Sequence, residues 1–372
     1  MTRILISGAG LGGLALAQAL RHGGLDVAVY ERDPTPQTRD QGYRLHIDQD
    51  GNTALRACLP PPVLDLVRDT SGVNGDLVAA FTQRLERVSA QEFPGLGPDL
   101  ISNVDRDTFR QGLLTGLDDV VVFGRTVTGY ETTGTGRVRV GFAGGGGDEG
   151  DLLVGADGVG SAVRRQLLPQ AGTRDLGLRC LYGRMPITEV TEPLIPADFH
   201  RGFCWVAGDN GLGAGFAPVR FRHRPAGYLM TVLVGPPALL GPGRPDLRQI
   251  ALESTADWHP TIKTLFSYAE ESSFFPVTIR AAQRVPAWPS GPVTLLGDAV
   301  HTMPPAGGVG ANTALQDAAT LSAELLAAAR GTRSLLEAVT AYERVMLPRG
   351  FTTVDNSVHM LTQMFPSPSD RV

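Results

Sequence analysis

Cysteine is scarce in this chain, and long apolar runs are missing. The three cysteines, Cys58, Cys180 and Cys204, are far apart and odd in number. This argues against a disulfide framework or a cysteine-based metal site, and it favours a reducing, cytoplasmic compartment. The uncharged stretch at residues 4–20 is interrupted by glycines and lacks a cleavage region, so it is not typical of a signal peptide. Elsewhere no run reaches the roughly 20 apolar residues that a membrane-spanning helix needs, and we expect no membrane span.

A basic cluster is also missing. The 33 Lys and Arg residues are dispersed among 38 Asp and Glu residues, and the formal net charge is −5. A surface for nucleic acid or for an anionic membrane would need clustered cations, so we expect neither partner. With 372 residues, 42% of them apolar, the chain is long enough for two packed domains or one large mixed domain.

Residues 3–31 carry the pattern of a dinucleotide-binding βαβ unit. A short apolar run at residues 3–7 is typical of a buried parallel strand, residues 14–20 have a helical pattern, and residues 27–30 have the pattern of a second strand. The residues between the first strand and the helix fit G-x-G-x-x-G, and they are Gly8, Ala9, Gly10, Leu11, Gly12 and Gly13.

Three glycines of this pattern have separate physical roles. Gly8 allows the tight turn, Gly10 lets a pyrophosphate approach the backbone, and Gly13 lets the helix pack closely on the strand. The pyrophosphate would lie at the helix N-terminus, whose free N–H groups and dipole favour anions. Glu31, at the end of the second strand, is placed to accept a hydrogen bond from a ribose hydroxyl, and we group Arg32 beside it with the cofactor contacts. This unit alone fits either NAD or FAD.

Two later segments favour FAD. Residues 151–158 have the pattern of a buried strand that ends in Asp157 and Gly158, and residues 293–298 have that of a strand that ends in Asp298. Asp298 is placed to bond a ribityl hydroxyl, whereas Asp157 has the alternative of simply capping the next helix. A helix then follows whose free N-terminus would stabilise negative charge on a reduced isoalloxazine. The cofactor contacts expected there are Pro305, Gly308, Gly310, Ala311 and Asn312.

In this order and spacing, the three motifs resemble the flavoprotein hydroxylase family with the para-hydroxybenzoate hydroxylase fold, over residues 1 to about 345. The resemblance implies an FAD that is bound tightly but not covalently. It also implies FAD contacts from Arg39, Arg106 and Val127, with the alternative that Arg106 is a solvated residue at a helix start. Because a second complete G-x-G-x-x-G pattern is missing, we expect NAD(P)H to dock transiently as the electron donor.

The predicted fold class is α/β. We expect a doubly wound, Rossmann-like FAD-binding domain, a smaller α+β substrate domain that carries an antiparallel sheet, and C-terminal helices. Within the first domain a hairpin at 125–142 is followed by a flexible tip at 143–150, and the helix of the C-terminal tail runs through residue 345. The domains are expected at 1–70, 96–180 and 276–330 for FAD binding, at 71–95 and 181–275 for the substrate, and at 331–372 for the tail.

The resemblance implies a monooxygenase. NAD(P)H would reduce the FAD, O2 would add at flavin C4a to give a hydroperoxide, and one oxygen atom would pass to an organic, aromatic or polyketide-like substrate. Hydroxylation, epoxidation and Baeyer–Villiger insertion all fit, and no residue stands out as a catalytic base. A flavin reductase of the same fold and a non-redox FAD-dependent cyclase are the alternatives.

Side chains of the antiparallel sheet are expected to wall the substrate site, because in the resembled family such a sheet covers the flavin. The alternative for each side chain is an ordinary place in the core. We expect no metal ligand, and either a monomer or a homodimer. The candidate wall residues are Phe203, Trp205, Phe216, Tyr228 and Met230, with Phe274 and Phe275 beside them.

Overall fold

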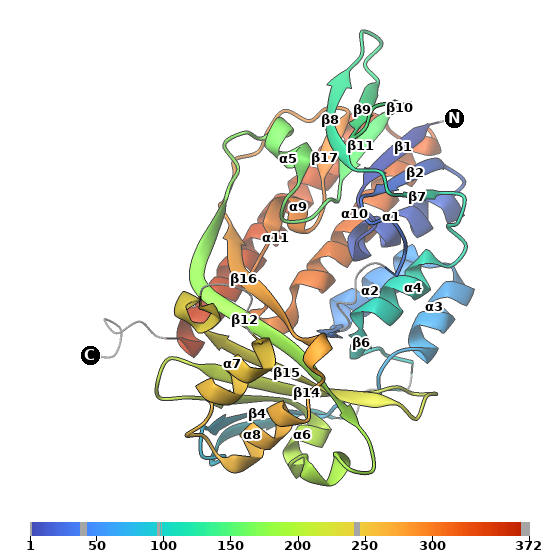
Figure 1. The fold of residues 1–372 in the computed structure, drawn as a ribbon. Coiled ribbons are helices and arrows are strands. Elements are labelled where there is room, and N and C mark those ends of the chain that lie inside the picture. Colours follow the sequence, from blue (N-terminus) through green and yellow to red (C-terminus); the bar gives the residue numbers. More distant parts are fainter. Residues whose placement is uncertain (1, 38–42, 95–96, 98, 242–245, 366–372) are drawn as a thin grey trace.

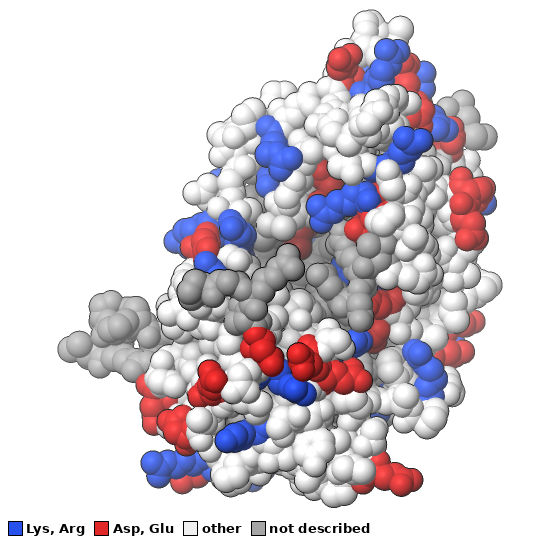
Figure 2. Space-filling model, in the orientation of Figure 1, with Lys and Arg blue, Asp and Glu red and all other residues white. Residues whose placement is uncertain are grey.

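A computed structural model describes residues 2–37, 43–94, 97, 99–241 and 246–365. Two layered regions are visible, and the long strands β12 and β16 run between them (Figure 1). We call the first the cofactor region, which contains the N-terminal βαβ unit. We call the large sheet of the second region the roof sheet. On the face drawn in Figure 2, acidic and basic side chains are interspersed.

The cofactor region is built on a five-stranded parallel sheet in the order β17-β11-β1-β2-β7. The central residues of its inner strands are apolar and buried, as expected for a parallel sheet that is covered on both faces, and they are Ile4 to Ile6, Val27 to Val29 and Leu152 to Val154. A three-stranded antiparallel sheet, β10-β9-β8, lies against it. The bounds are β1 Arg3–Ser7, β2 Asp26–Glu31, β7 Val121–Phe123, β8 Val127–Thr132, β9 Val138–Phe142, β10 Gly147–Gly150, β11 Leu152–Gly155 and β17 Val293–Leu295.

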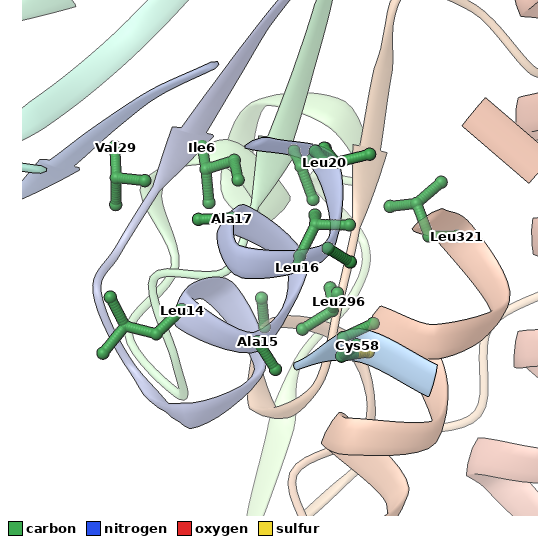
Figure 3. Close-up of a cluster of buried hydrophobic side chains, with 14 of the residues drawn as sticks. Ile6, Leu14, Ala15, Leu16, Ala17, Leu20, Val29, Cys58, Leu296 and Leu321 are labelled. Atoms are coloured by element: carbon green, nitrogen blue, oxygen red, sulfur yellow. The ribbon is translucent and has the colours of Figure 1, made fainter. Parts of the chain in front are cut away.

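Helices complete the cofactor region and share one hydrophobic core with its sheet. Helix α1 packs against α10, and Figure 3 shows Leu16 and Leu20 of α1 in one cluster with Leu296 and with Leu321 of α10. A two-stranded pair, β3 Arg44–His46 with β6 Asn103–Asp105, lies at the side nearest the roof sheet. The helices are α1 Leu11–His22, α2 Gln49–Cys58, α3 Pro61–Asp69, α4 Arg106–Leu114, α5 Ala162–Leu167, α9 Asp298–His301, α10 Gly310–Ala329 and α11 Leu335–Met364, with the 3-10 turn η4 Ala306–Gly308.

The roof sheet has seven strands in the order β16-β12-β15-β14-β13-β4-β5. Neighbours are antiparallel except β13 and β4, which are parallel. Helices α6, α7 and α8 cover its outer face, and its inner face is turned toward the cofactor region. The bounds are β4 Leu77–Thr82, β5 Arg87–Glu92, β12 Thr173–Ile187, β13 Gly202–Ala207, β14 Gly213–Arg220, β15 Gly227–Gly235, β16 Phe275–Ala282, α6 Ala197–Arg201, α7 Leu247–Ser254 and α8 Pro260–Ser267, with the turns η1 Glu192–Leu194, η2 Pro237–Leu240 and η3 Glu271–Ser273.

The predicted fold class is confirmed: the fold combines a Rossmann-like parallel sheet, a large sheet that is antiparallel apart from one pair, and C-terminal helices. The division into domains stays a prediction, and strand β12 runs across the proposed boundary at 180–181. No helix in the described ranges is long and apolar enough to cross a membrane.

Two local predictions were wrong. The expected flexible tip at 143–150 contains β10, which is ordered because its Asp148 accepts hydrogen bonds from the Arg3 guanidinium at 2.6 Å and from the Tyr30 hydroxyl. The C-terminal helix does not end near residue 345 but continues to Met364, with Pro348 inside it. Proline removes one hydrogen bond there, and buried Phe351 and the residues beyond it offset the loss by packing into the core.

Candidate functional site

The loop between β1 and α1, residues 8–13, needs glycine at two positions for reasons internal to the protein. Gly8 has a φ of 108°, and a Cβ there would lie 2.4 Å from the carbonyl oxygen of Ala156. A Cβ at Gly13 would lie 2.3 Å from the carbonyl oxygen of Gly8. Larger residues at these two positions would therefore displace backbone, which agrees with the turn and packing roles predicted for them.

Gly10 is different, because the protein itself leaves room for a side chain there. A Cβ on Gly10 would meet no atom of the described residues within 4 Å. Gly10 precedes the first turn of α1, and no side chain caps that turn. Among the described residues no side chain therefore occupies the N–H groups at this end of the helix, as an approaching pyrophosphate requires.

A buried ion pair between Glu31 and Arg110 stabilises this loop. Glu31 accepts hydrogen bonds from the backbone N–H of Ala9 at 2.8 Å and of Asp33 at 3.0 Å. Arg110, on α4, donates to the carbonyl oxygen of Ala9 at 3.0 Å and lies 3.9 Å from the Glu31 carboxylate. Glu31 therefore supports the loop directly, and its contact with a ribose stays a prediction. Sequence reasoning missed Arg110, whose one signal is an arginine on the apolar face of a helix.

The other contacts predicted near the adenosine end differ in exposure. Arg32 is exposed, and Val127 is buried at the start of β8, where it pairs with Phe142. Arg39 lies outside the described residues. The strand start at Val127 lies close to the end of β2, because the N–H of Arg125 donates to the carbonyl oxygen of Glu31 at 2.8 Å.

Asp157 uses its two carboxylate oxygens differently. One oxygen accepts from the backbone N–H of Ala162 at 2.8 Å and so caps α5, which is the alternative considered for this residue. The other oxygen, Oδ1, is buried and has no hydrogen-bond partner among the described residues. A buried carboxylate oxygen without a donor is costly, so this atom is suited to a ligand hydroxyl.

Asp298 is reached by solvent although protein groups surround it. Its side chain is exposed in terms of accessible surface, yet burial raises its pKa, against the opposing effects of His301 and Arg106. Within the described part of the chain its carboxylate has no hydrogen-bond donor, so it is available to a hydroxyl-bearing ligand.

Arg106 lies near this aspartate and is not a solvated residue. Its side chain is 15% exposed, and its Nη1 atom is buried without a hydrogen-bond partner in the described ranges. The guanidinium lies 5.8 Å from the ring centre of Tyr43. This nitrogen lies 3.8 Å from the Asp107 carboxylate but forms no hydrogen bond there, so it is suited to a hydrogen-bond acceptor on a ligand.

The N-terminus of α10 is the second uncapped helix end at the site. No side chain in the described part of the chain caps its first turn, and Gly307 and Gly308 before it have φ of 80° and 65°. The side chain of Asn312 is occupied, because its oxygen accepts from the N–H of Asp48 and its nitrogen donates to the carbonyl of His46. Only the backbone of Asn312 is therefore open to a ligand. Pro305 is exposed, whereas Gly308, Gly310 and Ala311 are partly buried.

A buried charged group fixes the turn that carries Asp298. Asp317 accepts hydrogen bonds from the N–H of Gly297 at 3.0 Å, from the Nε2 of His301 at 2.6 Å and from the guanidinium of Arg349 at 2.9 Å. Burial lowers the pKa of His301, but the charge and hydrogen bond of Asp317 outweigh it, so the pKa is raised overall. His301 is thus a packed, paired residue, and sequence reasoning missed Asp317 and Arg349.

The inner face of the roof sheet carries four of the five predicted wall residues. Side chains alternate between the faces of a strand, and Phe203 and Trp205 share the inner face with Tyr228 and Met230. Their neighbours there include Ala306, just before α10. These four are therefore turned toward the cofactor region.

The prediction for Phe216 was wrong, because its side chain lies on the outer face of the roof sheet. Phe216 stands opposite Cys204, is fully buried, and stacks on Phe199 of α6 with ring centres 5.1 Å apart. Phe274 also belongs to the outer core, whereas Phe275 does not. Phe216 and Phe274 both pack in the outer core beneath helices α6 to α8.

Three rings from distant segments meet on the inner side, and two of them were missed by sequence reasoning. Tyr43, Tyr182 and Phe275 have ring centres 5.1, 5.4 and 5.8 Å apart. Burial raises the pKa of Tyr43, whose surroundings include Arg106 and Asp298. An aromatic wall thus lies next to the groups predicted to hold the flavin.

The residues present fit FAD. The open space at Gly10 suits a pyrophosphate, the orphaned Asp157 oxygen and the Asp298 carboxylate suit hydroxyl groups, and the uncapped α10 suits an electron-rich ring. In the described ranges no three His, Cys, Asp or Glu side chains gather as metal ligands.

Comparison with known proteins identifies the class. A family described as FAD binding domain matches residues 121–357, more than half of the chain. The chain therefore belongs to this family of FAD-binding proteins and has the para-hydroxybenzoate hydroxylase fold, which confirms the resemblance and the cofactor.

Two of the three proteins compared below are named as FAD-containing or FAD-dependent monooxygenases, and the third was solved with FAD. A Photorhabdus luminescens protein described as an FAD-containing monooxygenase is 28% identical, with a TM-score of 0.86 over 98% of this chain and 99% of that one. HpxO of Klebsiella pneumoniae, solved with FAD and uric acid, is 25% identical, with a TM-score of 0.83 over 99% and 90%. The dual O-methyltransferase/FAD-dependent monooxygenase elcB of Phaeosphaeria nodorum is 34% identical over 86% of this chain and 39% of its own length. The chain thus spans less than half of such dual-function relatives.

Proposed function

We propose that this protein is a monooxygenase that uses NAD(P)H and O2 to insert one oxygen atom into an aromatic substrate. The observation that carries the proposal is the aromatic wall of Tyr43, Tyr182 and Phe275, which lies next to Asp298 and Arg106. A flat apolar substrate held there would lie against the flavin end of the cofactor.

The chain's own residues would position both partners and exclude water. Bound and reduced, FAD supplies the electrons that activate O2. Asp298 and Arg106 would orient the cofactor, while Phe203, Trp205 and Met230 on the inner face would close the space above it. Exclusion of water favours oxygen transfer to the substrate over wasteful release of hydrogen peroxide.

The relatives support an aromatic substrate without naming it. HpxO was solved with uric acid, a planar heterocycle. The dual-function relatives join this kind of chain to an O-methyltransferase, an activity that needs a free hydroxyl group on its substrate. A hydroxylated ring would satisfy both observations.

Substrate-stimulated NAD(P)H oxidation is the test. The FAD-loaded protein is mixed with NADH or NADPH and a panel of phenols and heterocycles, and nicotinamide, O2 and hydrogen peroxide are followed together. We expect some compounds to accelerate oxidation while little peroxide accumulates. Acceleration by no compound would favour a non-redox cyclase, and oxidation that consumes no O2 would favour a reductase; either result would refute the proposal.

A further inference from the structure

Arg44 carries a positive charge for which the protein offers no partner. It lies in β3, directly opposite Asp105 of β6. Its guanidinium forms no hydrogen bond and no ion pair with the residues that the structure describes, and its Nε atom is completely buried without a partner. Buried charges in proteins are normally paired, because removing an ion from water is costly.

Arg44 lies where β3 meets strand β14 of the roof sheet, and protein surrounds much of its side chain. It is only half-buried in accessible surface, yet burial lowers its pKa to about 10. Ordinary surface exposure would leave the guanidinium hydrated and its pKa high. The guanidinium is therefore partly desolvated by the protein around it, and with a pKa of about 10 it is still charged at neutral pH.

The nearest carboxylate is already engaged elsewhere. Asp105 accepts the hydroxyl of Tyr228 at 3.0 Å with one oxygen and the N–H of Thr108 at 2.9 Å with the other. Tyr228 belongs to the inner face of the roof sheet, and the guanidinium of Arg184 lies 5.8 Å from its ring centre. Arg44 and Arg184 thus both lie near Tyr228. The Asp105 carboxylate accepts its two hydrogen bonds from uncharged donors.

We propose that Arg44 is a specificity-determining residue that binds an ionised oxygen, a carboxylate or a phenolate, on the aromatic substrate. The proposal rests on the function proposed above, and it narrows the substrate class to aromatic carboxylic acids and ionised phenols. A guanidinium presents parallel N–H groups that match the two oxygens of a carboxylate, and it also pairs with a single phenolate oxygen. Tyr228, which lies near Arg44, belongs to the same inner-face cluster as Tyr182 of the aromatic wall, on which the ring of such a substrate would lie.

The test is calorimetric titration of the oxidised, FAD-loaded protein with matched acid and neutral ligands. Naphthoate is compared with naphthamide, and pentafluorophenol, which is ionised at neutral pH, with pentafluoroanisole. We expect at least one acid to bind about tenfold or more tightly than its neutral match, the scale of a hydrogen bond to a charged group. The pair that shows the preference distinguishes a carboxylate from a phenolate.

Three variants assign the preference to one side chain. Arg44→Gln should abolish it, and Arg44→Lys should retain part of it because the charge remains. Arg84→Gln, at an exposed arginine in the turn between β4 and β5, is the matched control and should leave it unchanged. FAD content and melting temperature are measured for each variant, and we expect wild-type values.

Three outcomes would overturn the proposal. These are equal affinity of the wild type for acids and neutral ligands, a preference that survives Arg44→Gln, and a loss of FAD in Arg44→Gln, which would mean that Arg44 serves the cofactor. The titration needs neither NAD(P)H nor O2. A protein that prefers acids but inserts no oxygen would therefore refute the proposed function alone, and the reverse result would refute this inference alone.

Discussion

The cofactor region and the inner face of the roof sheet use different parts of the chain to meet a ligand. The cofactor region presents backbone, with an open approach at Gly10 and two helix ends that no side chain caps. The roof sheet presents side chains, namely aromatic rings and Arg184, which lies beside Tyr228. Backbone geometry tolerates few substitutions, whereas side chains on a sheet face can be exchanged one by one. We infer that cofactor choice is fixed in this fold while substrate choice is free to change.

The largest effect should follow from filling the open space at Gly10. Gly10→Val places a side chain where the pyrophosphate would lie, and we expect a folded protein that is purified without FAD. The ratio of flavin to protein absorbance measures this. Gly134→Val is the control, since a Cβ at Gly134 also meets nothing within 4 Å and lies outside the site. A yellow, saturated Gly10→Val protein would break the claim that backbone binds the cofactor.

The buried group around Asp317 should give the largest loss of stability. Asp317→Asn removes the charge that pairs with His301 and Arg349, and we expect a loss of about 3 kcal/mol of unfolding free energy, as for other broken buried pairs. Glu324→Gln, which breaks the partly exposed pair with Arg333, should cost less than about 1 kcal/mol. Urea denaturation compares the two, and equal losses would contradict the account.

The buried group of Asp317, His301 and Arg349 also predicts that the unfolding free energy depends on pH. The pKa of His301 is raised in the folded protein, so its charged form is favoured by folding. This contribution to stability is fully present below the pKa of an unfolded histidine, and it is lost as pH rises through the folded pKa. Unfolding free energies measured across this range should fall with rising pH in the wild type and less steeply in Asp317→Asn. Identical slopes would show that His301 is not held in its charged form.

Removing the Asp298 carboxylate should weaken FAD without preventing its binding. Asp298→Ala is expected to cost about 1–3 kcal/mol of FAD affinity, the scale of a lost charged hydrogen bond. Fluorescence titration of the apoprotein with FAD measures the change, with Asp209→Ala on the roof side as a control. Unchanged affinity would mean that Asp298 does not touch the ribityl chain.

The smallest effects should separate the two faces of the roof sheet. Phe216→Leu on the outer face is expected to lower unfolding free energy by about 1 kcal/mol and to leave substrate kinetics unchanged. Phe203→Leu on the inner face should barely change stability but should raise KM for the compound that stimulates NAD(P)H oxidation. If Phe216→Leu raised KM instead, the assignment of faces would be wrong.

The two regions also differ in how far they can be predicted from the sequence. Gly8, Gly10, Gly13 and Asp298 belong to motifs whose function lies in local backbone geometry, and a short window of sequence contains all of it. Arg110 could not be found in this way, because it acts on Ala9, 101 positions earlier in the chain. The carboxylate of Asp317 likewise meets Arg349 only after α10 and α11 have packed together.

In the roof sheet, alternation along a strand defines two faces but not which of them is turned inward. Phe216 and Trp205 looked alike in the sequence, and only the register of β13 with β14 assigns them to opposite sides. Tyr43 and Tyr182 became a wall only through contacts between segments that are far apart in the chain. Side-chain sites of this kind depend on tertiary packing, which single-strand patterns do not contain.

The measurement that tests the central claim most directly is turnover of a stimulating compound under isotopically labelled oxygen. Product mass is determined after reaction of the FAD-loaded protein with NAD(P)H, once in labelled O2 with ordinary water and once in ordinary O2 with labelled water. We predict that one oxygen atom of the product comes from O2 and none of the inserted oxygen from water. A product that contains no atom from O2 would contradict the assignment of this protein as a monooxygenase.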